Sequence, residues 1–149
     1  QAGSIQYACS EEEGLGVNKQ FLVDTLLDSS APINVDYSSI TTQFGNCRQM
    51  GVVTLTDNYV LTQFGGSSAT AVVLSSGNVN LADDDTNPNG HQTTKYGGAG
   101  DSDLNVGTAP YSTKDASILQ FDFTPTTDGN ISFSFVFGSE EYTEYVDSS

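Results

Sequence analysis

Apolar and polar residues alternate over much of the chain, and this pattern predicts mainly β-strands. Residues 33–37 read Ile-Asn-Val-Asp-Tyr, which predicts a strand with one buried face. Two further strands are predicted at residues 51–56 and 58–64, around an Asp57-Asn58 turn. Residues 69–75 form a more continuous apolar run, which also favours a strand.

One segment has helical spacing instead. It begins after Asn18, a suitable N-cap, and ends near Asp28, with Pro32 four residues later. Its apolar stripe consists of Phe21, Leu22, Val23, Leu26 and Leu27. A helix this short is marginal alone, so we expect it to pack against a sheet. The preceding residues 1–17 are predicted to be irregular.

The clearest strand patterns occur late in the chain. Residues 118–123 place Leu119, Phe121 and Phe123 on one face, and residues 131–137 place Ile131 and three Phe at every second position. Residues 125–129 between them form a turn signal. We therefore predict a hairpin that faces a sandwich core. The chain has 149 residues, about the size of one domain. The predicted fold is all-β: a single jelly-roll-like β-sandwich over residues 1–149, with one short amino-terminal α-helix.

The net charge of −15 limits the kinds of partner that the chain can bind. Nineteen acidic residues face only four basic ones. Such a field repels nucleic acid and anionic membrane surfaces, and it attracts cations. No apolar run approaches the ~18–20 residues that a membrane span needs. We expect no nucleic-acid binding and no direct membrane insertion.

The acidic residues suggest a calcium site in residues 82–113, a long stretch without periodicity that we predict to be a structureless functional loop. From Asp85, oxygen-bearing side chains recur at alternate positions and Gly90 follows, as in the opening of a calcium loop. An EF-hand is excluded, because Tyr96 stands where the bidentate Glu belongs. The candidate ligands of Ca²⁺ are Asp83, Asp85, Asn87, Asn89, Asp101, Asp103 and Glu140. The alternative is an Asx-rich turn with solvated carboxylates.

Two cysteines, Cys9 and Cys47, are present. An even number in an acidic chain fits one disulfide made in an oxidising compartment. The bridge would close a loop of about 38 residues and contribute roughly 3–4 kcal/mol in the chain-entropy model. The alternative is two unrelated buried thiols.

Catalytic patterns are weak. Glu140 and Glu141 are paired carboxylates, but adjacent residues at a strand end point to opposite sides. No nucleophile elbow, zinc helix or phosphate loop is found. We expect a protein that is not an enzyme. Exposed aromatic residues in loops leave carbohydrate binding as the alternative function, with Tyr96 and Tyr111 as glycan contacts.

Four stretches, in order, resemble the choice-of-anchor L domain family of bacterial surface proteins. They are the helix ending at Leu26-Leu27, Ala-Val-Val-Leu-Ser-Ser-Gly at 71–77, Asp-Ser-Asp-Leu at 101–104 with residues 115–123, and Phe-Ser-Phe-Val-Phe-Gly-Ser-Glu-Glu-Tyr at 133–142. The resemblance implies export, a β-sandwich and a place at the cell surface. It supplies no catalytic residues. In the family more strands follow the last motif, whereas this chain stops at Ser149.

These observations together predict a secreted or cell-surface module with a structural or adhesive role. We expect it to be stabilised by calcium and to belong to a filament, surface layer or extracellular matrix. Its expected partners are other copies of itself, or another surface protein, which would supply the closing strands. Glycans are the expected partners under the alternative function.

Overall fold

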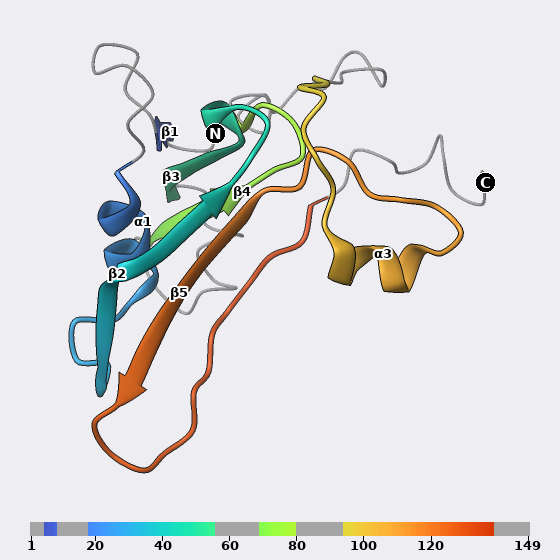
Figure 1. The fold of residues 1–149 in the computed structure, drawn as a ribbon. Coiled ribbons are helices and arrows are strands. Elements are labelled where there is room, and N and C mark those ends of the chain that lie inside the picture. Colours follow the sequence, from blue (N-terminus) through green and yellow to red (C-terminus); the bar gives the residue numbers. More distant parts are fainter. Residues whose placement is uncertain (1–4, 9–17, 56–68, 80–93, 139–149) are drawn as a thin grey trace.

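The computed structural model describes residues 5–8, 18–55, 69–79 and 94–138 (Figure 1). Within these residues the chain forms two antiparallel sheets, two α-helices and one turn of 3₁₀-helix. In chain order the elements are β1 (Ile5–Tyr7), α1 (Lys19–Leu26), β2 (Ile33–Gln43), η1 (Cys47–Gln49), β3 (Met50–Leu55), β4 (Ala69–Leu74), α3 (Ser102–Thr108) and β5 (Ile118–Pro125). No helix within the described ranges is long and apolar enough to cross a membrane.

The three-stranded sheet has the order β1-β3-β4. Its centre is β3, with Ile5 opposite Val53 on one side and Met50 opposite Leu74 on the other. The predicted strands are therefore confirmed over 51–55 and 69–74, and residue 56 lies outside the described residues. β1 corrects the prediction that residues 1–17 are irregular, since three residues are too short to show a two-residue period.

The two-stranded sheet joins segments that lie far apart in sequence. β2 pairs with β5, from Ile33 opposite Pro125 to Gln43 opposite Ile118. The register shifts between Asp36 and Thr41. At this bulge the Ser39 hydroxyl accepts a hydrogen bond from the Asp122 backbone N–H at 2.7 Å, which replaces a ladder bond.

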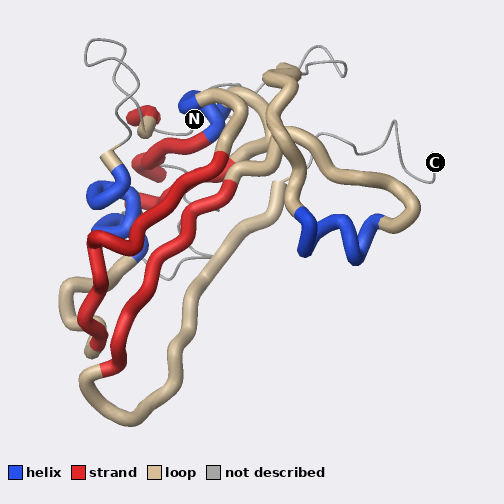
Figure 2. The backbone as a smooth tube through the Cα atoms, viewed as in Figure 1, coloured by secondary structure: helices blue, strands red, loops and turns tan. Residues whose placement is uncertain are grey.

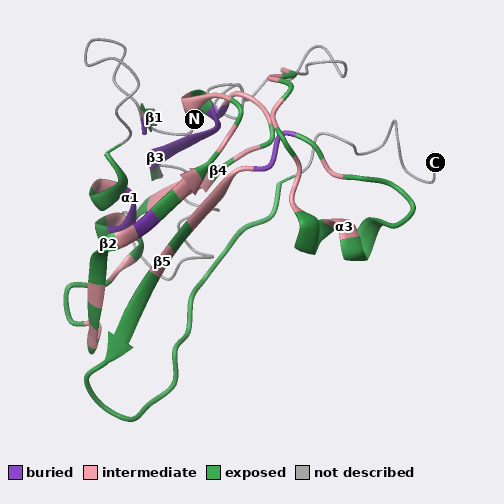
Figure 3. Ribbon diagram, viewed as in Figure 1, coloured by how far each residue is buried: buried purple, intermediate pink, exposed green. Residues whose placement is uncertain are grey.

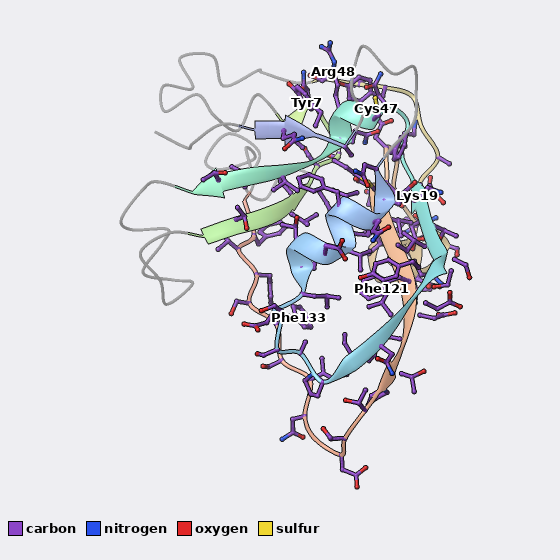
Figure 4. The ribbon with its side chains drawn as sticks, turned by 90° about the vertical axis from the view of Figure 1, so that its left-hand side faces the viewer. Tyr7, Lys19, Cys47, Arg48, Phe121 and Phe133 are labelled. Atoms are coloured by element: carbon purple, nitrogen blue, oxygen red, sulfur yellow. The ribbon has the colours of Figure 1, made fainter. Side chains whose placement is uncertain are left out.

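Helix α1 contacts β2 of one sheet and β3 and β4 of the other, and it lies between the two sheets (Figure 4). It begins as predicted, because the Asn18 side chain accepts from the Phe21 backbone N–H at 3.0 Å. The buried core lies where α1 meets β3 and contains Ala8, Leu22, Met50 and Val52. Figure 3 shows that burial is concentrated there, whereas α3 is mostly exposed.

Two expectations about the elements are wrong. Helix α3 lies inside the stretch predicted to be a structureless loop, so the described chain has two α-helices and not one. No residue of α3 is buried, so no apolar stripe could have predicted it. The second concerns Tyr37, which was expected on the buried face of its strand. It is 45 % exposed, because the bulge follows it and ends the alternation of β2.

The predicted hairpin is also wrong. β5 forms as expected, but it pairs with β2, and residues 126–138 form no strand (Figure 2). The chain leaves the sheet at Thr126, whose N–H bonds the Pro32 carbonyl at 2.8 Å. Residues 131–137 therefore do not face a core. Alternation tells which residues share a face, but it does not tell which strand they pair with. The predicted strand at 58–64 lies outside the described residues.

Candidate functional site

The candidate site is the segment from Thr94 to Thr113, which carries several of the predicted site residues. Asp115, which is buried, fixes its beginning. The Asp115 carboxylate accepts from the backbone N–H of Gly98 at 2.5 Å and of Tyr96 at 3.3 Å. Its backbone has a φ of 53°, a left-handed conformation that Asp tolerates better than most residues. The Asp115 carboxylate therefore holds the beginning of the segment, at residues 96–98.

A second buried residue, Gln49, connects Asp115 to two other parts of the chain. Its side chain is fully buried, at 0 % exposure. The amide oxygen accepts from the backbone N–H groups of Gly45 at 2.6 Å and Asn46 at 2.8 Å. The amide nitrogen reaches three backbone carbonyls, those of Ser75 (3.2 Å), Ser76 (3.2 Å) and Asp115 (2.9 Å). The side chain thus joins three separate segments of the chain.

Sequence reasoning missed Gln49, although it had singled out two of the stretches that Gln49 connects, 71–77 and 115–123. A signal was present in the spacing. Asn46 and Gln49 form a capping box around η1, the Asn-x-x-Gln version of a common helix-start pattern. A polar residue directly before a buried strand is a second signal, since β3 follows immediately.

The segment packs so closely that glycine is required at one position above all. A Cβ on Gly100 would lie 1.9 Å from the Thr113 carbonyl oxygen. Thr113 also binds through its side chain, since its hydroxyl accepts from the Asp101 N–H at 2.9 Å. The residues just before α3 and those after it are therefore held together.

Two of the predicted calcium ligands lie at the start of α3. Asp101 caps the helix, and its Oδ1 accepts from the N–H groups of Asp103 at 2.9 Å and Leu104 at 3.0 Å. Asp103 is exposed in the first turn. Both line an open cavity of about 530 Å³ between α3 and the β2–β5 sheet, together with Thr41, Thr42, Gln43, Leu104, Ile118 and Gln120.

The remaining predicted ligands, Asp83, Asp85, Asn87, Asn89 and Glu140, lie outside the described residues. Within the described residues no three His, Cys, Asp or Glu side chains come together as a metal-binding group. The structure therefore places Asp101 and Asp103 near each other and gives no position for the other five.

The two predicted glycan contacts differ in exposure. Tyr111 is 66 % exposed and lies just after α3. Tyr96 is half-buried, and its backbone N–H is held by Asp115. Tyr111 therefore presents a free ring face to solvent more fully than Tyr96.

A second open cavity, of about 490 Å³, lies between the end of α1 and the start of β2. The Tyr37 hydroxyl donates to Asp24 Oδ1 at 2.6 Å across its wall. This hydrogen bond to a carboxylate raises the pKa of Tyr37, because ionised Tyr37 could no longer donate it. Nearby, hydrogen bonds from the Ser30 hydroxyl and N–H lower the pKa of Asp28.

Cys47 is disulfide-bonded and begins η1, next to Arg48 (Figure 4). Arg48 lies over the Tyr7 ring of β1, with 5.8 Å from its guanidinium carbon to the ring centroid. The predicted partner, Cys9, lies outside the described residues, although it is the only other cysteine in the chain.

Residues 131–137 form the most exposed apolar segment that the structure describes, and we call it the Phe segment. Phe133 and Phe135 lie on the same side, with ring centroids 6.1 Å apart. The exposed apolar side chains are Ile131 (65 %), Phe133 (82 %), Phe135 (76 %), Val136 (59 %) and Phe137 (83 %). Contiguous exposed apolar patches of several hundred Å² usually mark interaction sites.

Comparison with known protein families matches residues 12–149 to the choice-of-anchor L domain. The match includes α1, all of the candidate site and the Phe segment. No curated protein and no solved structure matches the chain.

Proposed function

The chain belongs to the choice-of-anchor L domain family, and from this membership we propose that it is a structural or adhesive module of an exported protein. Membership implies anchoring at the cell surface. The observation on the chain that supports an adhesive role is the exposed Phe segment. A surface protein that builds contacts with neighbouring chains needs such a patch, whereas an isolated soluble monomer gains nothing from exposing three Phe rings. The role requires no catalysis and no nucleic acid.

The location can be tested on intact cells of the source organism. Antibody against residues 1–149 should label the cell exterior or its extracellular assemblies, and protease added outside should remove the label. Label found only after the cells are opened would contradict the proposal.

We propose that the two sheets belong to a β-sandwich with α1 between them. The core supports this arrangement, because Leu119 of β5, Phe21 of α1 and Val72 of β4 pack against the same buried cluster. The jelly-roll-like order of strands is part of the same proposal.

We further propose that calcium binds between the acidic run at residues 83–89 and the start of α3, with Glu140 as an additional ligand. Two observations support the site: Asp101 and Asp103 line the same cavity, and only one oxygen of Asp101 is used in capping. Oxygen ligands of this kind suit Ca²⁺. Removing calcium with EGTA should lower the melting temperature by several degrees.

Asp103→Asn should abolish most of this EGTA effect, because it removes a ligand charge without changing the cap. Asp128→Asn removes an equal charge at an exposed position away from the cavity and serves as the control. An unchanged melting temperature of the wild type in EGTA would show that calcium does not stabilise the protein.

Carbohydrate binding is the second candidate function, and the 66 % exposure of Tyr111 favours it. Exposed aromatic rings stack on sugar faces in binding modules. A glycan array probed with wild-type protein should then give signals that Tyr111→Ala removes. The more buried Tyr96 should matter less, so Tyr96→Phe is expected to bind like wild type. An array without signal would rule this function out.

A further inference from the structure

The β2–β5 sheet has an open edge. β2 lies on one side of β5, and no described residue is hydrogen-bonded to the other side. Two-stranded antiparallel sheets are only marginally stable in water, and a third strand is usually needed. The free N–H and C=O groups of such an edge are a template for strand addition from another chain.

The Phe segment has the complementary properties. It alternates apolar and polar residues from Ile131 to Phe135, with Val136 in the next polar position, it carries no charge, and it belongs to no sheet. We propose that two copies of the chain exchange it: the Phe segment of each copy adds to β5 of the other as a third, antiparallel strand. This inference rests on the proposed structural role and names the partner that the Phe segment contacts.

The register of the exchange follows from the faces of β5. If Ile131 lies opposite Phe123, the apolar residues of both strands share one face, with Phe133 opposite Phe121 and Phe135 opposite Leu119. The other face then pairs Asp122 with Ser132, Gln120 with Ser134 and Ile118 with Val136. Cross-strand aromatic pairs and a β-branched pair stabilise this arrangement, and no carboxylate faces another.

Charge favours this exchange over the direct pairing of two Phe segments with each other. Antiparallel self-pairing centred on Ser134 would place Asp128 opposite Glu140 at both ends. In a chain with a net charge of −15, such like-charge pairs oppose association. Exchange onto β5 avoids them.

The available area and symmetry both fit a dimer. The five exposed side chains of one Phe segment present roughly 700 Å², given ~150–250 Å² for each aromatic. Two exchanges per dimer reach the ~1,200–2,000 Å² that stable interfaces bury. Each copy carries both the donated segment and the accepting edge, so the exchange is reciprocal and closes with two-fold symmetry.

Sedimentation equilibrium on the full chain tests the proposal. Wild type should be dimeric at micromolar concentration. Phe133→Ser/Phe135→Ser should weaken the dimer by roughly 100-fold or more, because central aromatic residues dominate such interfaces. Val106→Ser removes an apolar side chain of α3 that is as exposed as Phe133, at 82 % each, and should leave the dimer unchanged.

Mixed samples of labelled and unlabelled copies locate the contact. Intermolecular NMR contacts should connect Phe133 with Phe121, and they should be absent in the Phe133→Ser/Phe135→Ser variant. A monomer at all concentrations, a dimer that the two Ser substitutions do not weaken, or Phe133–Phe121 contacts found only within one copy would each overturn the exchange. A monomer found on the cell surface would leave the proposed structural role standing, whereas a dimer confined to the cell interior would contradict only that role.

Discussion

At the scale of single residues, the fold depends on a few polar side chains that the alternating pattern does not reveal. Gln49 and Asp115 are the buried polar residues among the described residues. The Gln49 side chain donates to the Asp115 backbone carbonyl, and the Asp115 carboxylate accepts from the backbone N–H groups of Gly98 and Tyr96. Buried polar groups are costly when left unpaired, so a satisfied pair of this kind specifies one arrangement of the neighbouring loops.

Replacing Gln49 should therefore destabilise the fold strongly. Gln49→Met keeps the volume but leaves the backbone groups of Gly45, Asn46 and Asp115 without their partner. We expect the free energy of unfolding to fall by about 2–4 kcal/mol. Urea denaturation measures it, and Gln20→Met at an exposed position of α1 is the control. Equal midpoints for the two variants would contradict the role given to Gln49.

Substituting Ala for two glycines, Gly100 and Gly107, should have opposite effects on stability. Gly100→Ala would press a methyl group against the Thr113 carbonyl, so it should destabilise by at least about 2 kcal/mol. Gly107→Ala meets no atom within 4 Å and lies in α3, where Ala favours the helix by about 1 kcal/mol. Melting temperatures should therefore move in opposite directions. Parallel shifts would show that the segment relaxes around the added methyl group.

Tyr37 should make stability depend on alkaline pH. Its pKa is raised above the ordinary value of 10.0, chiefly by its hydrogen bond to Asp24. A raised folded pKa means that the stabilisation is present below the unfolded pKa and is lost as pH rises through the folded pKa. The tyrosinate absorbance change that Tyr37→Phe removes should therefore titrate above pH 10. In Asp24→Asn it should move back toward 10, and an unmoved titration would argue against the bond.

At the scale of elements, the β2–β5 pairing contains an unfavourable contact. Asp36 and Asp122 lie directly opposite each other across the ladder. Hydrogen bonds from the Ser38 hydroxyl and N–H lower the pKa of Asp36, which keeps this carboxylate charged. Like charges directly opposite on neighbouring strands destabilise a sheet.

Asp122→Asn should therefore raise the melting temperature slightly at neutral pH, because it removes one of the two facing charges. The gain should shrink in high salt, because screening weakens the repulsion between exposed charges. Thermal melts at two salt concentrations measure both effects, with Asp128→Asn as the control for net charge. A gain that is equal in Asp128→Asn would reflect the overall charge of −15 and not this pair.

The elements also show what could be predicted from the sequence. Strong periodicity located α1, β2, β3, β4 and β5, because local alternation and a cap depend only on nearby residues. It could not give the partner of β5, which lies about eighty residues earlier, nor α3, which buries no side chain. For the candidate site, the acidic pattern singled out Asp101 and Asp103 as calcium ligands, and their binding of calcium stays a prediction. Gln49 was missed because its role depends on three distant carbonyls.

At the scale of the whole molecule, the disulfide at Cys47 fastens the turn before β3. If its partner is Cys9, as the sequence predicts, the bridge restricts the unfolded chain over about 38 residues. Reduction should then lower the free energy of unfolding by roughly 3–4 kcal/mol. Cys47→Ser should match the reduced wild type in a denaturant titration. Alkylation of two thiols in unfolded, unreduced protein would contradict the bridge.

The long reach of the β2–β5 pairing has a consequence for the order in which the protein folds. The β1-β3-β4 sheet and α1 can form as soon as residue 74 has been synthesised. β2 must then wait for β5, which begins only at Ile118. Contacts between distant residues form slowly, and an unpaired strand is prone to aggregation in the meantime. We therefore expect a folding intermediate with an ordered amino-terminal half, and the eleven-residue strand β2 as its most vulnerable part.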